Sequence, residues 1–122
     1  MPRPSRVHRF KDNGSNCWAS IVLSSGEPCW ISVSPGSVVV KRSRFGLFGS
    51  LIYRETDGRR NAAIAAALSR AVPNSLLPHG FSTAALSSFT NAALYCSNSS
   101  ELSHLLDKAA AEGEQQHDMN TE

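Results

Sequence analysis

Apolar and polar residues alternate through the first half of the chain, and this alternation predicts an antiparallel sheet. The clearest case is the stretch 28–43, where β-branched residues flank a turn at Pro35-Gly36. Pro35 presets its own φ, and Gly36 accepts the positive φ that the next turn position requires. The expected cross-strand pairs are Val33 with Val38, Ser32 with Val39, Ile31 with Val40 and Trp30 with Lys41. This register gives one face that is apolar on both strands, which predicts the core side of the sheet.

Two more segments extend the pattern into a meander of about four strands. Residues 17–23 alternate between an apolar and a mixed face, and residues 50–54 resume the strand pattern after a loop that contains two glycines. The sheet is therefore expected to run from about residue 17 to residue 54. Residues 1–16 are basic and interrupted by prolines, so we expect a flexible arm there, with a short edge strand at Val7, His8 and Phe10 as the alternative.

After residue 55 the hydrophobic period becomes helical and predicts two or three helices between residues 59 and 112. Each helix is preceded by a residue that can cap its first turn. The expected N-caps are Asp57, Ser82 and Asn98, the last with Glu101 in a capping box. The expected stops are Pro73 after the first helix and Gly113 after the third. The acidic residues 113–122 are expected to form a disordered tail.

These elements together predict an α+β fold. The antiparallel sheet of residues 17–54 comes first, and the helices of residues 59–112 are expected to cover its apolar face. Residues 17–112 then form a single domain between the arm and the tail, in keeping with a chain of 122 residues.

Charge is distributed unevenly along the chain. Residues 1–70 hold eleven Lys and Arg against four Asp and Glu, a net charge of +7. Residues 71–122 hold one Lys against six Asp and Glu, a net charge of −5. Such an asymmetry can mark a nucleic-acid or acidic partner for the basic half, and it can equally let the two halves of the chain, or two copies of it, attract one another.

Cys17, Cys29 and Cys96 are odd in number and lack the spacing of metal ligands. The hairpin expected around residues 25–26 sets Val22, not Cys17, beside Cys29, so no disulfide is predicted. The N-terminus lacks the apolar segment of a secretory signal, and no apolar run is long enough to cross a membrane. We therefore expect a cytoplasmic protein with reduced thiols and no membrane partner.

Catalytic and metal-binding patterns are weak in this sequence. The segment Gly80-Phe81-Ser82-Thr83-Ala84 partly matches the nucleophile elbow of serine hydrolases, but alanine stands where the elbow has its second glycine. Helix capping explains Ser82 without a partner, and His79 is close only in sequence, so a hydrolase built on Ser82 is the third hypothesis. The four histidines are scattered, so we expect no metal, and no motif indicates a cofactor or a known family.

Basic and aromatic residues gather between residues 30 and 48. The candidate binding surface consists of Trp30, Lys41, Arg42, Arg44, Phe45 and Phe48. Because paired catalytic groups are missing, the leading hypothesis is a small non-enzymatic module that binds another protein or itself. The alternative is nucleic-acid binding through these cations together with Arg3, Arg6 and Arg9, with the aromatic rings stacking on bases. The two phenylalanines are expected to fold back over the sheet, since exposed apolar clusters are uncommon.

Overall fold

A sheet of five strands and a layer of three helices make up the structure. The computed structural model describes residues 3–73 and 76–120 of the 122-residue chain. The strands are β1 (Arg6–Lys11), β2 (Cys17–Val22), β3 (Pro28–Ser34), β4 (Ser37–Arg42) and β5 (Ser50–Glu55). The helices are α1 (Gly58–Ala71), α2 (Ala84–Tyr95) and α3 (Ser99–Asn120). The predicted α+β class is confirmed, with five strands where the sequence predicted about four.

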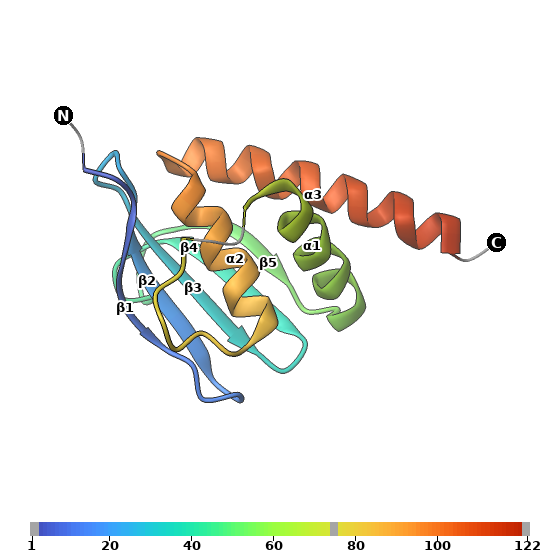
Figure 1. Cartoon of the computed structure of the whole chain (residues 1–122), viewed down its shortest axis with the longest axis horizontal. Helices are drawn as coiled ribbons and strands as arrows, with labels where there is room; N and C mark the ends of the chain where they lie inside the picture. Colours follow the sequence, from blue (N-terminus) through green and yellow to red (C-terminus); the bar gives the residue numbers. More distant parts are fainter. Residues whose placement is uncertain (1–2, 74–75, 121–122) are drawn as a thin grey trace.

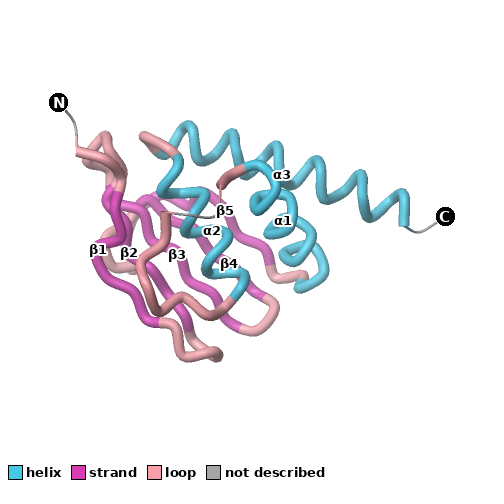
Figure 2. Tube along the Cα trace, in the orientation of Figure 1, coloured by secondary structure: helices cyan, strands magenta, loops and turns pink. Residues whose placement is uncertain are grey.

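The strands lie in the order β1-β2-β3-β4-β5, and every neighbouring pair is antiparallel. Helices α1 and α2 lie on one side of this sheet, and α3 runs alongside α1 (Figures 1 and 2). α2 packs on β2 and β3, whereas α1 and α3 lie nearer to β4 and β5. This two-layer arrangement leaves the other face of the sheet without a helix over it in the described part of the chain (Figure 2).

The register of the central hairpin is the one that the sequence predicted. β3 and β4 pair Val33 with Val38, Ser32 with Val39, Ile31 with Val40 and Trp30 with Lys41. Every residue of the expected apolar face is buried, with Val33 the most exposed at 8%. Opposite this face, the helices contribute Ile64, Leu68, Leu86, Phe89, Leu102 and Leu106 to the same core. The predicted core face is confirmed.

The additional strand is β1, which forms one edge of the sheet within the segment expected to be an arm. It pairs with β2 through a register that shifts between Val7 and Arg9. Val7 and Phe10 pack against the core, and the ring of Phe10 stacks on Phe81 at 4.2 Å. The exposed side chains of β1 are basic, as is common at a sheet edge, where charge discourages pairing with another chain. The edge-strand alternative thus describes this segment, and residues 1–2 lie outside the described residues.

Local capping signals placed two of the three helix starts correctly. The carboxylate of Asp57 accepts a hydrogen bond from the backbone N–H of Arg59 at 2.9 Å. The side-chain oxygen of Asn98 accepts one from the N–H of Glu101, also at 2.9 Å. These contacts satisfy donors that the first helical turn would otherwise leave without partners.

The prediction that Ser82 caps the second helix is wrong. The N-cap is Thr83, and its side chain makes no hydrogen bond to the helix backbone. Instead, the carboxylate of Asp12, just after β1, accepts the backbone N–H groups of Ser82 and Thr83. A side chain from 70 residues earlier therefore holds the start of α2, and no local sequence pattern marks such a contact.

The predicted helix stop at Gly113 is also wrong, because α3 continues to Asn120. Gly113 lies against α1, where an added β-carbon would come within 3.3 Å of the β-carbon of Ala63. Because Gly113 has no side chain, α1 and α3 can approach each other closely at this position. The glycine therefore serves helix packing and does not end α3. Residues 114–120 of the expected tail continue α3, and residues 121–122 lie outside the described residues.

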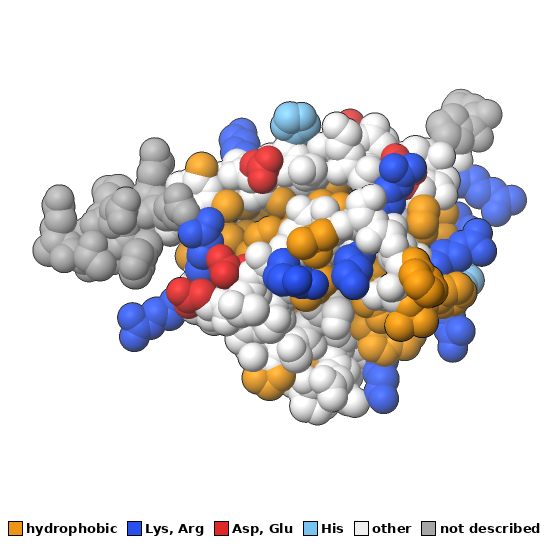
Figure 3. Space-filling view, turned by 180° about the vertical axis from the view of Figure 1, so that it is seen from behind, with side chains coloured by type: hydrophobic (Ala, Val, Ile, Leu, Met, Phe, Trp, Pro, Cys, Tyr) orange, Lys and Arg blue, Asp and Glu red, His pale blue; other side chains and the backbone are white. Residues whose placement is uncertain are grey.

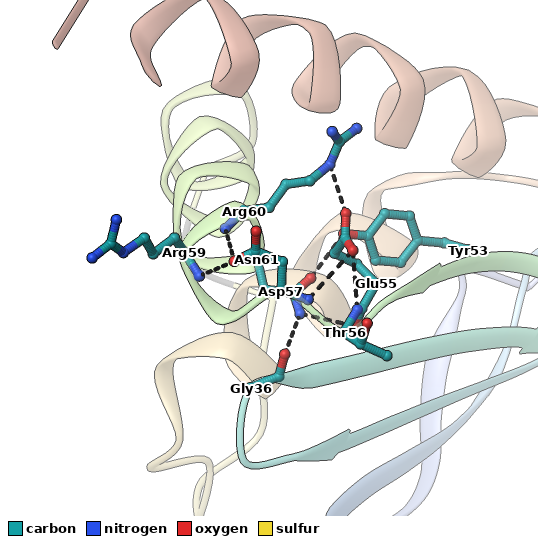
Figure 4. A network of polar contacts seen from close by, with 8 residues as sticks. All are labelled: Gly36, Tyr53, Glu55, Thr56, Asp57, Arg59, Arg60 and Asn61. Carbon is teal, nitrogen blue, oxygen red and sulfur yellow. Dashed lines mark hydrogen bonds and ion pairs between the residues drawn. The ribbon is translucent and has the colours of Figure 1, made fainter. Parts of the chain in front are cut away.

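A polar network fixes the junction between β5 and α1 (Figure 4). The amide nitrogen of the buried Asn61 donates to the carbonyl oxygens of Gly36, at 2.9 Å, and of Glu55, at 3.0 Å. Its amide oxygen accepts the hydroxyl of Tyr53 at 2.8 Å. An ion pair of 2.6 Å between Glu55 and Arg60 closes the network. These contacts tie the β3–β4 turn, β5 and α1 together.

All three cysteines are free thiols and are buried. In the β2–β3 pair Cys29 lies opposite Ile21, one residue away from the expected Val22, and Cys17 lies opposite Val33. No helix in the described ranges has the length and apolar character that a membrane span requires.

Candidate functional site

The face of the sheet opposite the helices carries a mixture of aromatic, aliphatic and basic side chains. The pairing register assigns to this open face Arg6, Arg9, Lys11, Trp18, Ser20, Val22, Pro28, Trp30, Ser32, Val39, Lys41, Leu51 and Arg54. None of these thirteen positions holds Asp or Glu. The view from behind, onto this face, shows hydrophobic side chains gathered beside several Lys and Arg side chains (Figure 3).

Two tryptophans form the centre of the open face. Trp18 of β2 and Trp30 of β3 stack with ring centroids 4.9 Å apart and an angle of 16° between the ring planes. They are diagonal neighbours, since Trp18 pairs with Ser32 and Trp30 pairs with Ser20. Both rings are partly exposed. The two indoles therefore pack against each other on two central strands of the sheet, and part of each ring remains accessible.

The loop 43–49, between β4 and β5, folds onto this aromatic pair. A β-carbon added at Gly46 would lie 2.5 Å from Nε1 of Trp30, so the bare backbone of Gly46 contacts the indole. The ammonium of Lys41 donates to the Gly46 carbonyl at 3.1 Å, and the Ser20 hydroxyl donates to the Arg44 carbonyl at 3.2 Å. Trp30 is thus contacted by the ring of Trp18 and by the backbone of this loop, which reaches across to Ser20 on β2.

The expectation that Phe45 and Phe48 fold back over the sheet is wrong. Phe45 is 69% exposed and Phe48 is 85% exposed, and Leu47 between them is 76% exposed. The loop contacts the sheet with its backbone, through the carbonyls of Arg44 and Gly46 and the α-carbon region of Gly46 against Trp30. The apolar side chains on either side of Gly46 therefore point away from the core.

Among the described residues, six cations on this face or on the adjoining loop carry no counter-ion, although Lys41 donates one hydrogen bond to the Gly46 carbonyl. Arg6, Arg9, Lys11, Lys41, Arg44 and Arg54 form no ion pair within the described part of the chain. Arg42 differs, because its guanidinium pairs with Glu27 at 3.0 Å and its side chain lies on the helix side of β4. A hydrogen bond from Ser99, together with the charge of Arg42, keeps the pKa of Glu27 below its usual value. Of the predicted surface residues, Arg42 is therefore set apart from the others.

A hollow of about 240 Å³ lies between β1 and the loop 43–49. Its walls are Arg6 and His8 on one side and Arg44 and Phe45 on the other, over a floor of Ser20, Val22 and Pro28. Ser20 links the hollow to the aromatic pair, because it lies opposite Trp30 in the sheet and holds the Arg44 carbonyl. Basic groups, an exposed ring and the tryptophan stack thus lie on one continuous surface.

A second hollow, of about 450 Å³, lies on the helix side beside the β3–β4 turn. Its lining consists mainly of small residues from α1 and α2, such as Ala62, Ala65 and Ala85. The amide of Asn61, which also borders it, is already bonded to Tyr53 and two backbone carbonyls. Among the described residues, none that lines this hollow is a cation, an aromatic ring or a titratable group.

The described residues give the remaining candidate chemistry little support. Ser82 and His79 are both exposed and share no hydrogen bond within residues 3–73 and 76–120. Burial raises the pKa of the Cys29 thiol to about 12 and that of Cys96 to about 11, so both stay protonated and weakly nucleophilic. No group of three His, Cys, Asp or Glu side chains among the described residues could hold a metal ion.

Sequence reasoning missed Trp18, Lys11 and Arg54 as parts of this surface. The strand alternation placed Trp18 on the mixed face of β2, but the diagonal contact with Trp30 depends on the register between β2 and β3. Lys11 and Arg54 join the surface only once β1 and β5 are added to the two sides of the sheet.

Comparison with protein-family models, with curated proteins and with solved structures found no match to this chain.

Proposed function

We propose that the protein is a non-enzymatic binding module and that the open face of its sheet binds single-stranded nucleic acid. The observation that carries the proposal is the stacked pair of Trp18 and Trp30 among six cations without ion pairs. Proteins that hold single strands without a strong sequence preference combine a positively charged surface with aromatic rings on which bases stack. The open face has both features.

The charge of this surface favours a polyanion over a neutral protein partner. No open-face position holds an acidic residue, and the nearby Asp12 and Glu27 are occupied by hydrogen bonds from α2 and α3. A phosphate backbone crossing the sheet would meet Lys11 and Arg9 on the β1 side and Lys41 and Arg54 on the β4–β5 side. Each phosphate contact releases condensed counterions, so affinity is expected to decrease steeply with salt.

The aromatic pair favours a single strand over a duplex. Trp30 is in contact with Trp18 and Gly46, so the partly exposed Trp18, which pairs with Lys11 in the sheet, is the better candidate to stack on a base. Stacking of one base on such a ring contributes about 1–3 kcal/mol, whereas the bases of a duplex are already stacked on each other. Lys11 beside this ring can hold the adjoining phosphate.

The test is a titration of the full chain with a labelled oligothymidylate at about 50 mM salt, where phosphate contacts are strong. The expected result is binding with quenching of tryptophan fluorescence, and weaker binding of a duplex of equal length. Polyphosphate should bind without the quenching, because it has charge but no bases. A flat titration with oligothymidylate at this salt concentration would reject the proposal.

Charge-matched variants locate the binding face. Arg9→Ala and Arg54→Ala each remove an open-face cation, whereas Arg59→Ala removes an exposed cation from the helix side. The first two should each lower the slope of log affinity against log salt by about 0.7, the single-strand value for one contact. Arg59→Ala should leave the slope unchanged. Equal effects of all three variants would mean that the protein responds only to its net charge.

A second candidate, binding to another protein or to a second copy, is favoured by the exposed tip of the loop 43–49. Phe45, Leu47 and Phe48 are between 69% and 85% exposed and adjoin one another, and contiguous apolar surface often marks a protein interface. Phe48→Ala should then lower the molar mass in solution, measured at two salt concentrations with and without the oligonucleotide. A monomeric wild-type protein would remove self-association from consideration.

A further inference from the structure

We propose that the hollow between β1 and the loop 43–49 is a subsite for one nucleotide of the bound strand, with Phe45 as the stacking ring and Arg6 and Arg44 as the phosphate ligands. This inference rests on the proposed function and adds a location to it. It concerns a part of the open face that is distinct from the tryptophan pair.

The size of the hollow suits a single planar group. At about 240 Å³ it is smaller than the roughly 300–1,000 Å³ of pockets that enclose drug-sized ligands. Val22 and Pro28 give its floor apolar surface beside Ser20, and the exposed ring of Phe45 forms one wall. A nucleobase that leaves the stack of its neighbours needs such flat apolar contacts on its faces.

Charge converges on the same hollow from two elements. Arg6 comes from β1, and Arg44 comes from the loop 43–49 on the other side. Neither arginine forms an ion pair in the described part of the chain. Two guanidinium groups at one opening together offer more N–H donors and more positive charge to a phosphate than one arginine does. The two arginines suit a phosphate, and the apolar walls beside them suit a planar base, so the combination favours a nucleotide over a simple anion.

The loop holds these groups in place before any ligand arrives. The Ser20 hydroxyl fixes the Arg44 carbonyl, and the hydroxyl of the buried Ser43 accepts the backbone N–H groups of Phe45, at 3.3 Å, and Gly46, at 3.0 Å. A preorganised site of this kind loses less conformational entropy on binding than a free loop would. Because Ser20 lies opposite Trp30, the subsite is next to the tryptophan pair, and adjacent nucleotides of one strand can occupy both.

The experiment compares the affinities of four proteins for the labelled oligothymidylate: the wild type, Phe45→Ala, Phe45→Tyr and Leu47→Ala. Leu47 is the matched control, because it is equally exposed in the same loop but does not line the hollow. Phe45→Ala should weaken binding about 5- to 150-fold, the equivalent of one lost stacking contact. Phe45→Tyr should restore affinity to within twofold of the wild type, and Leu47→Ala should stay within twofold as well.

Cross-linking gives a readout that does not depend on variants. An oligothymidylate carrying a single iodouracil should cross-link to the peptide that contains Phe45 as well as to those with the tryptophans.

The two arginines of the hollow are tested by salt dependence. Arg6→Ala and Arg44→Ala should each lower the slope of log affinity against log salt by about 0.7, and Arg59→Ala should not.

The outcomes separate the subsite from the function. If the wild type binds and Phe45→Ala weakens binding no more than Leu47→Ala, the strand does not enter the hollow and the subsite inference is wrong, while the proposed function stands. If the wild type shows no binding, both are wrong. If an acidic peptide such as polyglutamate displaces the labelled oligonucleotide as well as unlabelled oligothymidylate does, the hollow recognises charge alone. The nucleotide subsite is then rejected.

Discussion

Asp12 and Thr83 join the edge strand of the sheet to the start of α2. The carboxylate of Asp12 accepts the backbone N–H of Thr83 at 2.7 Å and the hydroxyl of the same residue, across 71 positions of sequence. It also accepts the backbone N–H of Ser82. An anion at a helix N-terminus satisfies free N–H groups and interacts favourably with the helix dipole. This contact holds β1, and with it the cations of one side of the open face, against the helical layer.

Replacing Asp12 by alanine is therefore expected to cost about 1–2 kcal/mol in the free energy of unfolding. Urea unfolding of Asp12→Ala measures this loss. Asp107→Ala is the matched control, because Asp107 is an exposed acid in the middle of α3. A similar small effect of both variants would show that the Asp12 contact contributes little.

The same contact makes the free energy of unfolding depend on pH in the acidic range. Although desolvation opposes ionisation, the hydrogen bonds from Thr83, Ser82 and Cys17 hold the pKa of Asp12 well below its usual range. Since the folded pKa is depressed, this stabilisation is fully present above the unfolded pKa of about 3.9 and is lost as pH falls below it. Wild-type stability should decrease more steeply than that of Asp12→Asn between about pH 5 and pH 2. Parallel pH profiles would contradict this expectation.

Local signals in the sequence were sufficient for the centre of the fold and for two helix caps. The turn at Pro35-Gly36 fixes the β3–β4 register, and Asp57 and Asn98 each cap a helix that begins at the next residue. The errors at Ser82 and Gly113 share a cause: both depend on contacts with distant residues. Asp12 takes over the capping of α2, and the packing of α1 against α3 keeps Gly113 inside a helix.

The candidate surface was predictable only in part for the same reason. Alternation along β3 and β4 placed Trp30 and Lys41 together, and the structure pairs them. The stacking of Trp18 on Trp30 depends on the β2–β3 register, which the sequence placed one residue away from its position in the structure. The exposure of Phe45 and Phe48 depends on how the loop 43–49 meets Trp30, which periodicity does not encode.

The β3–β4 register predicts a large loss of stability for one substitution and a small change for the substitution at the next residue. Val38→Asp places a charge at a position that is 1% exposed and should cost several kcal/mol, enough to unfold a domain of this size. Val39→Asp places the same charge on the open face, opposite Arg54, and should change stability by less than about 1 kcal/mol. Thermal unfolding of both variants tests this, and a reversed order would contradict the register.

The ionisation of Tyr53 reports on the junction between β5 and α1. Burial, with a smaller contribution from the charge of Glu55, raises the pKa of Tyr53 to about 12 from its ordinary 10.0. Because the folded pKa is raised, the stabilisation is present below the ordinary value and is lost as pH rises from about 10 to about 12. Absorbance titration of Tyr95→Phe, in which Tyr53 is the remaining tyrosine, should give a midpoint near 12. The Tyr53→Phe variant identifies the signal of the other tyrosine, and a midpoint near 10 with the fold intact would contradict the burial of this phenol.

Gly46 has a positive φ and also contacts the indole of Trp30. Alanine substitutions at Gly46 and at Gly14 can separate the effect of backbone strain from the effect of this contact. Gly46 and Gly14 both have positive φ, +77° and +91°, so alanine at either position should cost about 1 kcal/mol through backbone strain. Only at Gly46 would the new β-carbon also collide with Trp30, at 2.5 Å from Nε1, whereas at Gly14 it meets no atom within 4 Å.

Gly46→Ala should therefore lose more stability than Gly14→Ala and should change the near-ultraviolet circular dichroism of the tryptophan pair. If the open face binds a single strand, Gly46→Ala should also weaken oligothymidylate binding, because the loop that carries Arg44 and Phe45 can no longer lie on Trp30. Gly14→Ala should leave both the spectrum and the affinity near their wild-type values. Equal behaviour of the two variants would mean that the loop does not depend on its contact with the indole.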